Sequence, residues 1–140
     1  MDRRGAGWMM RFDQCRLWVP GRPVPKGRAR AGARGRVYTP VVTRRAEAEV
    51  VRLACEAWGR RPPLVAPVDV LVEVHCSAYR GDLDNIAKLV LDALQKAGVL
   101  RNDRDVWHLC VVRIEASRGR EGTYVRAAHI GSVILPVGEG

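Results

Sequence analysis

The chain of 140 residues lacks several features that would assign it to a well-known class of protein. No stretch reaches the roughly 18 consecutive apolar residues that a membrane-spanning helix requires. The basic residues 1–11 contain no apolar core of signal-peptide length, so we expect no secretion signal. A P-loop, a Rossmann glycine pattern and a nucleophile elbow are also missing. The sequence therefore argues against a membrane protein, a secreted protein and the common nucleotide-binding enzymes.

Cysteine is present only as four isolated residues, Cys15, Cys55, Cys76 and Cys110. None forms a Cys-x-x-Cys pair, and their spacing indicates neither a zinc site nor a disulfide framework. Because an unpaired cysteine usually behaves as a small apolar residue, we expect four reduced, buried thiols in a cytoplasmic protein.

Apolar residues recur with clear periods along much of the chain. Residues 68–78 alternate valine with other side chains, which is typical of a strand with one buried face. Residues 84–97 place apolar side chains at helical spacing, and Gly98 is a fitting C-terminal residue. An earlier helix is expected to begin at an N-cap, Thr43, and to end near Gly59. Further strands are expected at 9–19, 106–116 and 123–130.

This order of elements predicts an α+β fold, formed by one small domain over residues 1–140. We expect a mixed β-sheet packed against two main helices. Residues 20–40 are rich in Gly and Pro and are expected to form a long loop. Residues 1–8 and 136–140 are expected to be flexible ends.

The positive charge of the chain is concentrated near its beginning. The net charge is +9; residues 1–36 contain ten basic and two acidic side chains, and residues 37–140 contain fourteen and thirteen. Such a basic segment is typical of proteins that bind polyanions, although a solvated basic arm would have the same composition. The candidate phosphate-binding residues in the 20–40 loop are Lys26, Arg28, Arg30, Arg34 and Arg36.

An acidic cluster lies between a predicted strand and the helix that follows it. Asp82 and Asp84 are two residues apart, so an extended backbone directs both carboxylates to one face. Four-residue steps then place Asp84, Lys88, Asp92 and Lys96 on one stripe of the helix. Clustered carboxylates repel phosphate, but together they can hold a hard divalent cation against it.

A structural explanation of this cluster accounts for only part of it. Taken alone, Asp84 is more readily explained as an ordinary helix cap, and the stripe as a solvated face. That explanation does not require Asp82, nor Asn85 where a better helix former would serve. It also leaves a second polar group, Asn102 and Asp103, unexplained.

Two other kinds of metal site fit the sequence less well. An EF-hand fails because Ala87 occupies the position of the turn glycine and Ala93 that of the bidentate glutamate. A zinc site would need ligands scattered over predicted strands without the usual ligand spacing. Those scattered candidates are His75, Cys76, His108, Cys110 and His129.

At these motifs the sequence resembles the RusA family of Holliday junction resolvases, known in bacteria and their phages. The resemblance is collinear from about Gly21 to Val112 and is most specific at residues 82–88, Asp-Leu-Asp-Asn-Ile-Ala-Lys. It also covers the basic segment 21–30, the residues 37–40 and the segment 102–106.

The resemblance implies a homodimeric, RusA-like endonuclease that depends on Mg²⁺, with Mn²⁺ as an alternative ion, and cuts four-way DNA junctions. It places Asp82, Asp84 and Asp103 on the catalytic metal-binding acids and Lys88 on the functional lysine. Asn85 and Asp92 are candidate supporting residues.

The chain departs from the family pattern near its third acid. Asn102 stands where the family often has an acid, and Asp105 where it often has Gln. We retain Asp103 as the third ligand, with Asp105 as a less favoured substitute. Two alternatives to a resolvase therefore stay open, namely a branched-DNA-binding protein with a decayed site and a nuclease that prefers flaps or forks.

Overall fold

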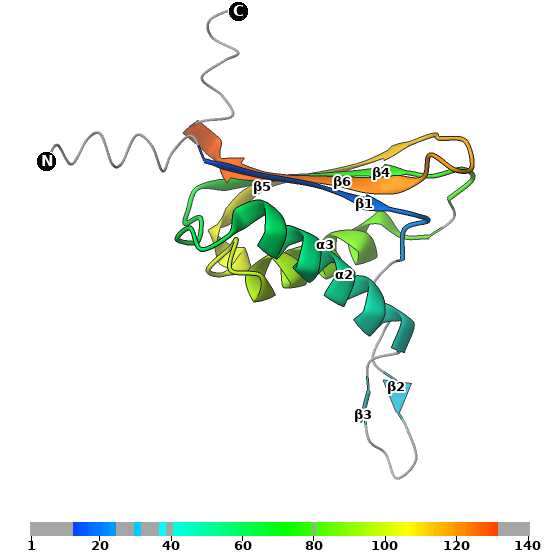
Figure 1. Ribbon diagram of the computed structural model, residues 1–140, viewed down its shortest axis with the longest axis horizontal. Helices are drawn as coiled ribbons and strands as arrows, with labels where there is room; N and C mark the ends of the chain where they lie inside the picture. The colour runs from blue at the N-terminus through cyan, green and yellow to red at the C-terminus, as the bar shows by residue number, and fades with distance from the viewer. Residues whose placement is uncertain (1–12, 25–29, 32–36, 39–40, 80, 132–140) are drawn as a thin grey trace, which may run out of the picture.

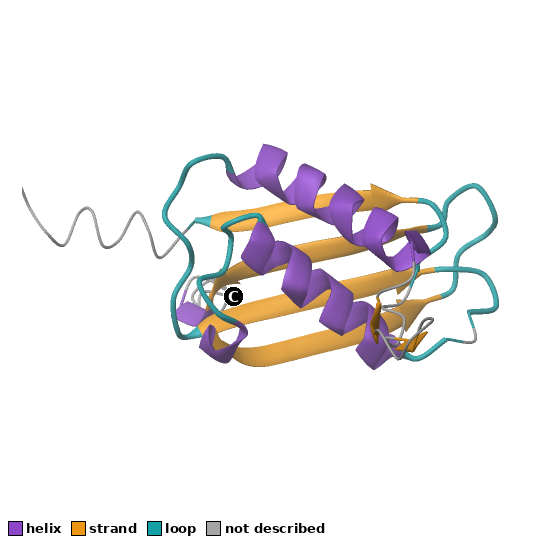
Figure 2. Ribbon diagram, turned by 90° about the horizontal axis from the view of Figure 1, so that it is seen from below, coloured by secondary structure: helices purple, strands orange, loops and turns teal. Residues whose placement is uncertain are grey.

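A computed structural model describes residues 13–24, 30–31, 37–38, 41–79 and 81–131. Its described part is a four-stranded β-sheet with two helices packed on one face (Figures 1 and 2). A separate two-stranded ribbon lies near the start of the first helix. The predicted α+β class, with a mixed sheet and two main helices, is confirmed.

The main sheet has the strand order β1-β6-β4-β5. β4 is parallel to β5 and antiparallel to β6, and β6 is antiparallel to β1. The valines of β4 alternate as predicted, because all four have no exposed surface and lie in the hydrophobic core. The strands are β1 (Gln14–Pro20), β4 (Val68–His75), β5 (Val106–Ile114) and β6 (Gly122–His129).

The two helices, α2 (Val41–Trp58) and α3 (Leu83–Lys96), pack against each other and cover the core face of the sheet (Figure 2). One side of α3 is buried, as its sequence period predicts; the side chains on that face are Ile86, Ala87, Leu89, Val90, Ala93 and Leu94. Gly98 follows the helix with a φ of +79°, a conformation that glycine adopts without steric cost. The predicted C-terminal role of Gly98 is therefore confirmed.

The predicted start of α2 and the predicted end of β4 differ from the structure. α2 begins two residues before Thr43, which is buried inside the helix instead of capping it. β4 ends at His75, three residues earlier than predicted: the Cys76 N–H still donates to the Ile114 carbonyl oxygen of β5, but the two backbone N–H groups after it bond to side chains instead of a strand. Ser77 N–H donates to Glu121 and Ala78 N–H donates to Glu115.

The predicted loop at residues 20–40 contains two short strands, β2 (Arg30–Ala31) and β3 (Val37–Tyr38), which pair antiparallel. Most of the remaining loop lies outside the described residues, as do the two predicted flexible ends.

The cysteine prediction is wrong for one residue. Cys15 and Cys76 are buried and Cys110 is partly buried, but Cys55 is exposed. Cys55 follows the fully buried Ala54 on α2, and one step along a helix turns a side chain away from the core. All four are free thiols, and burial raises the pKa of Cys15 to about 11. Among the described residues, no helix is long and apolar enough to cross a membrane.

Candidate active site

The two acids of the Asp-x-Asp motif lie at the N-terminus of α3, directly after the loop that follows β4. Asp82 occupies the N-cap position with extended backbone, but its carboxylate forms no capping hydrogen bond. Asp84 lies in the first helical turn, so the interpretation of Asp84 as the cap is wrong. The Asp82 carboxylate is therefore available for another role at this end of the helix.

The polar stripe of α3 divides into two parts. Asp82, Asp84 and Lys88 are exposed at the beginning of the helix, whereas Asp92 is partly buried. At the far end Lys96 forms an ion pair with Glu47 of α2, and this hydrogen bond raises the pKa of the lysine. The first part of the stripe is thus open to a ligand, while its last residue links the two helices.

The N-terminal end of α3 provides a suitable setting for a divalent cation. Partial positive charge at a helix N-terminus stabilises the carboxylates of Asp82 and Asp84. Their donor atoms are all oxygens, and half-buried Asn85 adds an amide oxygen nearby. Hard cations such as Mg²⁺ prefer oxygen ligands and commonly use only one or two protein carboxylates. These residues fit such an ion.

Asp103 lies at the opposite end of α3, in the short helix η2 (Asp103–Asp105) that precedes β5. A helix of 14 residues is about 21 Å long, so Asp103 is separated from Asp82 by roughly the length of α3. Within the described part of the chain, no group of three His, Cys, Asp or Glu residues could hold a metal ion. The predicted three-acid set is therefore not assembled within one chain, and neither is the zinc alternative.

The other two polar residues of this segment have structural contacts. Asn102 caps η2, because its side-chain oxygen accepts a hydrogen bond of 2.9 Å from the Arg104 N–H. Asp105 is buried and receives two hydrogen bonds from Arg101, at 3.1 and 3.2 Å. Both oxygens of Asp105 are engaged in this pair, so Asp105 is a poor substitute for Asp103, which is exposed.

Replacing Asp105 with Asn should lower the free energy of unfolding by about 1–3 kcal/mol, because a buried charge-assisted contact with Arg101 is lost. Urea unfolding followed by circular dichroism measures the change. Asp103→Asn is the matched control on the same short helix and should leave stability unchanged. Equal destabilisation by the two variants would contradict these roles.

The predicted phosphate-binding side chains cannot be placed. Arg30 belongs to β2, where its backbone pairs with Tyr38 of β3. The other four, Lys26, Arg28, Arg34 and Arg36, lie outside the described residues.

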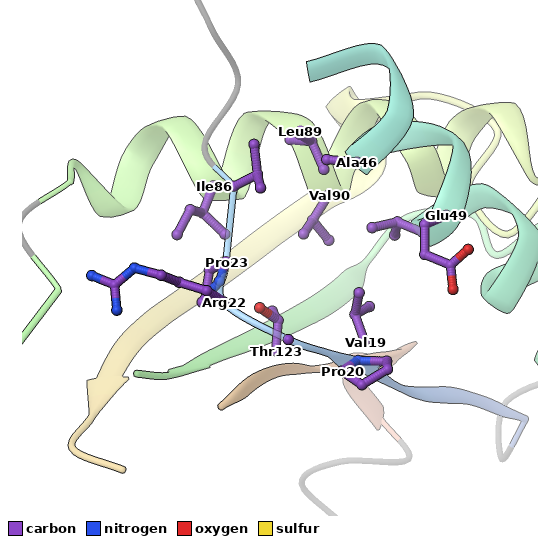
Figure 3. Close-up of a pocket in the computed structure, with 13 residues that line it drawn as sticks. Val19, Pro20, Arg22, Pro23, Ala46, Glu49, Ile86, Leu89, Val90 and Thr123 are labelled. Carbon is purple, nitrogen blue, oxygen red and sulfur yellow. The ribbon is translucent and has the colours of Figure 1, made fainter. Parts of the chain in front are cut away.

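An apolar cavity of about 140 Å³ lies between the end of β1 and the two helices (Figure 3). Ile86, Leu89 and Val90 of α3 line one side, and the charged residues Arg22 and Glu49 also contribute. Neither acid of the Asp-x-Asp motif is among its lining residues. The cavity is therefore adjacent to the start of α3 but does not contain the proposed metal ligands.

Sequence reasoning missed the residues that shape the loop before Asp82. Tyr79 is buried, and its hydroxyl has no hydrogen-bond partner among the described residues. A Cβ at Gly81 would lie 2.2 Å from that hydroxyl oxygen, so glycine allows the ring to fold over the backbone. Burial raises the pKa of Tyr79, and the charges of Cys76 and Asp82 raise it further. Gly81 was a signal in the sequence, because it directly precedes the acidic motif.

Comparison with known proteins supports the motif-based resemblance. The family model "Endodeoxyribonuclease RusA" matches residues 20–126. The crossover junction endodeoxyribonuclease RusA of Shigella sonnei is 34% identical over 95 residues, which span 67% of this chain and 72% of that protein. The proteins of the same name from Escherichia coli K12 and Enterobacteria phage 82 are 33% and 30% identical over the same spans. The chain therefore belongs to the RusA family of endodeoxyribonucleases, enzymes that hydrolyse phosphodiester bonds in DNA.

Proposed function

We propose that this protein is a Mg²⁺-dependent endonuclease that resolves four-way DNA junctions during recombination and repair. One observation carries the proposal. The exposed Asp82 carboxylate forms no capping bond and stands beside Asp84 at the start of α3, inside the segment that matches the family. The relatives indicate the substrate class, because each is a crossover junction endodeoxyribonuclease.

Each charged group at the start of α3 has a distinct role in this proposal. Asp82 and Asp84 would hold the divalent ion through carboxylate oxygens. When bound, that ion would lower the pKa of the attacking water and offset charge on the phosphoryl oxygens. Protonated Lys88 has only donors and is no metal ligand in that form, so its ammonium group would neutralise phosphate charge one turn along the helix.

The position of Asp103 offers a chemical reason for the proposed homodimer. Asp82 and Asp103 lie at opposite ends of α3. A two-fold axis that places the α3 helices of the two protomers antiparallel would therefore bring Asp82 of one protomer close to Asp103 of the other. The partner's Asp103 would then complete the site that Asp82 and Asp84 begin. Two-fold symmetry would produce two identical sites, which matches the two symmetry-related phosphates of a four-way junction.

The basic 20–40 loop would hold the phosphates on either side of the cut. Replacing Arg28 with Ala should weaken junction binding and reduce the slope of log K against log salt by about 1, because one fewer counterion is released. Gel-shift titrations at several salt concentrations, without metal, measure this slope. Arg60→Ala, at the other end of α2 from the loop, is the matched control and should preserve it.

A panel of labelled substrates tests the proposed function against its alternatives. We expect one preparation, in Mg²⁺, to cleave a four-way junction faster than a flap, a fork or a linear duplex of the same arm sequence. Faster cleavage of the flap or fork would support a related nuclease of different specificity. Retention of the junction in a gel shift without any cleavage would support a binding protein with a decayed site.

A further inference from the structure

We propose that Glu121 is a positioning residue. It connects the segment between β4 and α3, which leads to the proposed catalytic acids, with Arg22, where the chain leaves β1 for the basic loop. This inference rests on the proposed function and adds to it a structural connection between the basic loop that would bind DNA and the acids that would cleave it. Glu121 lies just before β6, far in sequence from both parts that it joins. It lies within the matched residues 20–126 but outside the motifs described above.

A single carboxylate oxygen of Glu121 accepts three hydrogen bonds from two separate segments. Arg22 Nη1 donates at 3.0 Å, the Ser77 N–H at 2.9 Å and the Cys76 thiol at 3.1 Å, all to Oε2. The Glu121 side chain is only 13% exposed. The backbone bond from Ser77 and the thiol bond hold the pKa of Glu121 below its usual value. A charged, nearly covered carboxylate with this many donors forms a well-defined junction between segments.

The same contacts connect the segments that follow β1 and β4 with the residue that precedes β6. Arg22 Nη1 also donates to the Ser77 carbonyl oxygen at 3.1 Å, so its guanidinium contacts both members of the Glu121–Ser77 pair. The Gly21 N–H donates to the Glu121 carbonyl oxygen at 2.9 Å. The backbone of the residues that leave β1 toward the basic loop is therefore held by Glu121 as well.

The segment fixed by Glu121 leads directly into the site. Ser77 is five positions before Asp82, and β4 has already ended at His75. Apart from Glu121, four described contacts hold this segment: the Cys76 N–H donates to the Ile114 carbonyl oxygen, Arg22 donates to the Ser77 carbonyl oxygen, Glu115 accepts from the Ala78 N–H, and the Tyr79 ring is buried. Release of Ser77 would allow the acids at the start of α3 to shift. A displacement of about 1 Å in a catalytic group can reduce a rate about 100-fold.

Four variants test this connection: Glu121→Ala, Glu121→Gln, Arg22→Ala and the double variant Arg22→Ala with Glu121→Ala. We expect Glu121→Ala to lower kcat for junction cleavage about tenfold or more, with a change in junction Kd below about threefold. Glu121→Gln, which keeps an oxygen acceptor for Ser77, should recover most of the lost kcat. The double variant should be no slower than Glu121→Ala, because both changes break one network.

The control is Glu56→Ala, which removes an exposed carboxylate that pairs with Arg52 on α2. It should change neither kcat nor Kd. Two results would overturn the proposal: additive losses in the double variant, or a Glu121→Ala effect confined to Kd. Additive losses would make Arg22 an independent phosphate ligand.

Amide hydrogen exchange separates this inference from the proposed function. Glu121→Ala should accelerate exchange at Ser77 and the residues that follow it, while exchange in the centre of β4 stays unchanged. The exchange rate at Ser77 does not depend on cleavage. An inactive wild type would therefore contradict the proposed function but not the positioning role of Glu121. Unchanged exchange at Ser77 would overturn the positioning role even if the wild type cuts junctions.

Discussion

Replacing Asp82 with Asn should reduce the single-turnover rate of junction cleavage by about 10²–10³-fold, because loss of the proposed metal ligand would remove several kcal/mol of transition-state stabilisation. Junction binding should be unchanged or slightly tighter, since the substitution removes a negative charge close to phosphate. The fold should be unaffected, because the Asp82 carboxylate makes no capping bond in the free protein. Rapid-quench cleavage in Mg²⁺ and gel-shift titration without metal measure the two effects.

Glu56→Gln provides a matched loss of one exposed carboxylate, located on α2. It should leave the cleavage rate unchanged. If Asp82→Asn instead weakens binding and cleavage in parallel, or lowers thermal stability, Asp82 is a structural residue and the proposed metal site at α3 is wrong.

The second large effect is expected from mixing two inactive variants. Asp82→Asn and Asp103→Asn should each be inactive alone, but a mixture that has exchanged subunits should nick the junction. In the proposed heterodimer, one site would combine an intact Asp82 with the partner's Asp103, and the other site would carry both substitutions. Recovered activity should therefore appear as single nicks instead of paired cuts. Nicking of a supercoiled cruciform plasmid distinguishes these products.

Subunit exchange must be established independently, for example by native mass spectrometry of one tagged and one untagged variant. Heterodimers that form but stay inactive would show that sites are not shared between chains. In that case Asp103 acts elsewhere, and the acids at the start of α3 would need another third ligand.

Much of the fold follows from periods in the sequence. The apolar period of α3 and the alternation of valine in β4 are direct consequences of burying one face of each element. The ends of strands were less predictable where a backbone N–H bonds to a side chain from a distant segment instead of to the neighbouring strand. Backbone pairing with β5 stops after Cys76, because the Glu121 carboxylate, 44 residues beyond Ser77, receives the Ser77 N–H.

The candidate site shows the same limit in a different form. Residue types at the start of α3 indicated metal chemistry, and the structure leaves those side chains exposed. The sequence could not show that Asp103 lies at the other end of the helix, since spacing along a chain does not specify direction in space. The contact between Arg22 and Glu121 was also not predictable, because the two residues are 99 positions apart and no local pattern connects them.

The most direct test of this account is a cleavage assay of the wild-type chain on a labelled synthetic four-way junction, with Mg²⁺ or with EDTA. A linear duplex of the same arm sequence serves as the control. We expect paired, symmetrically placed cuts on the junction, only in the presence of the metal, and an intact duplex. A junction that is bound but never cut, or cut equally well in EDTA, would contradict it.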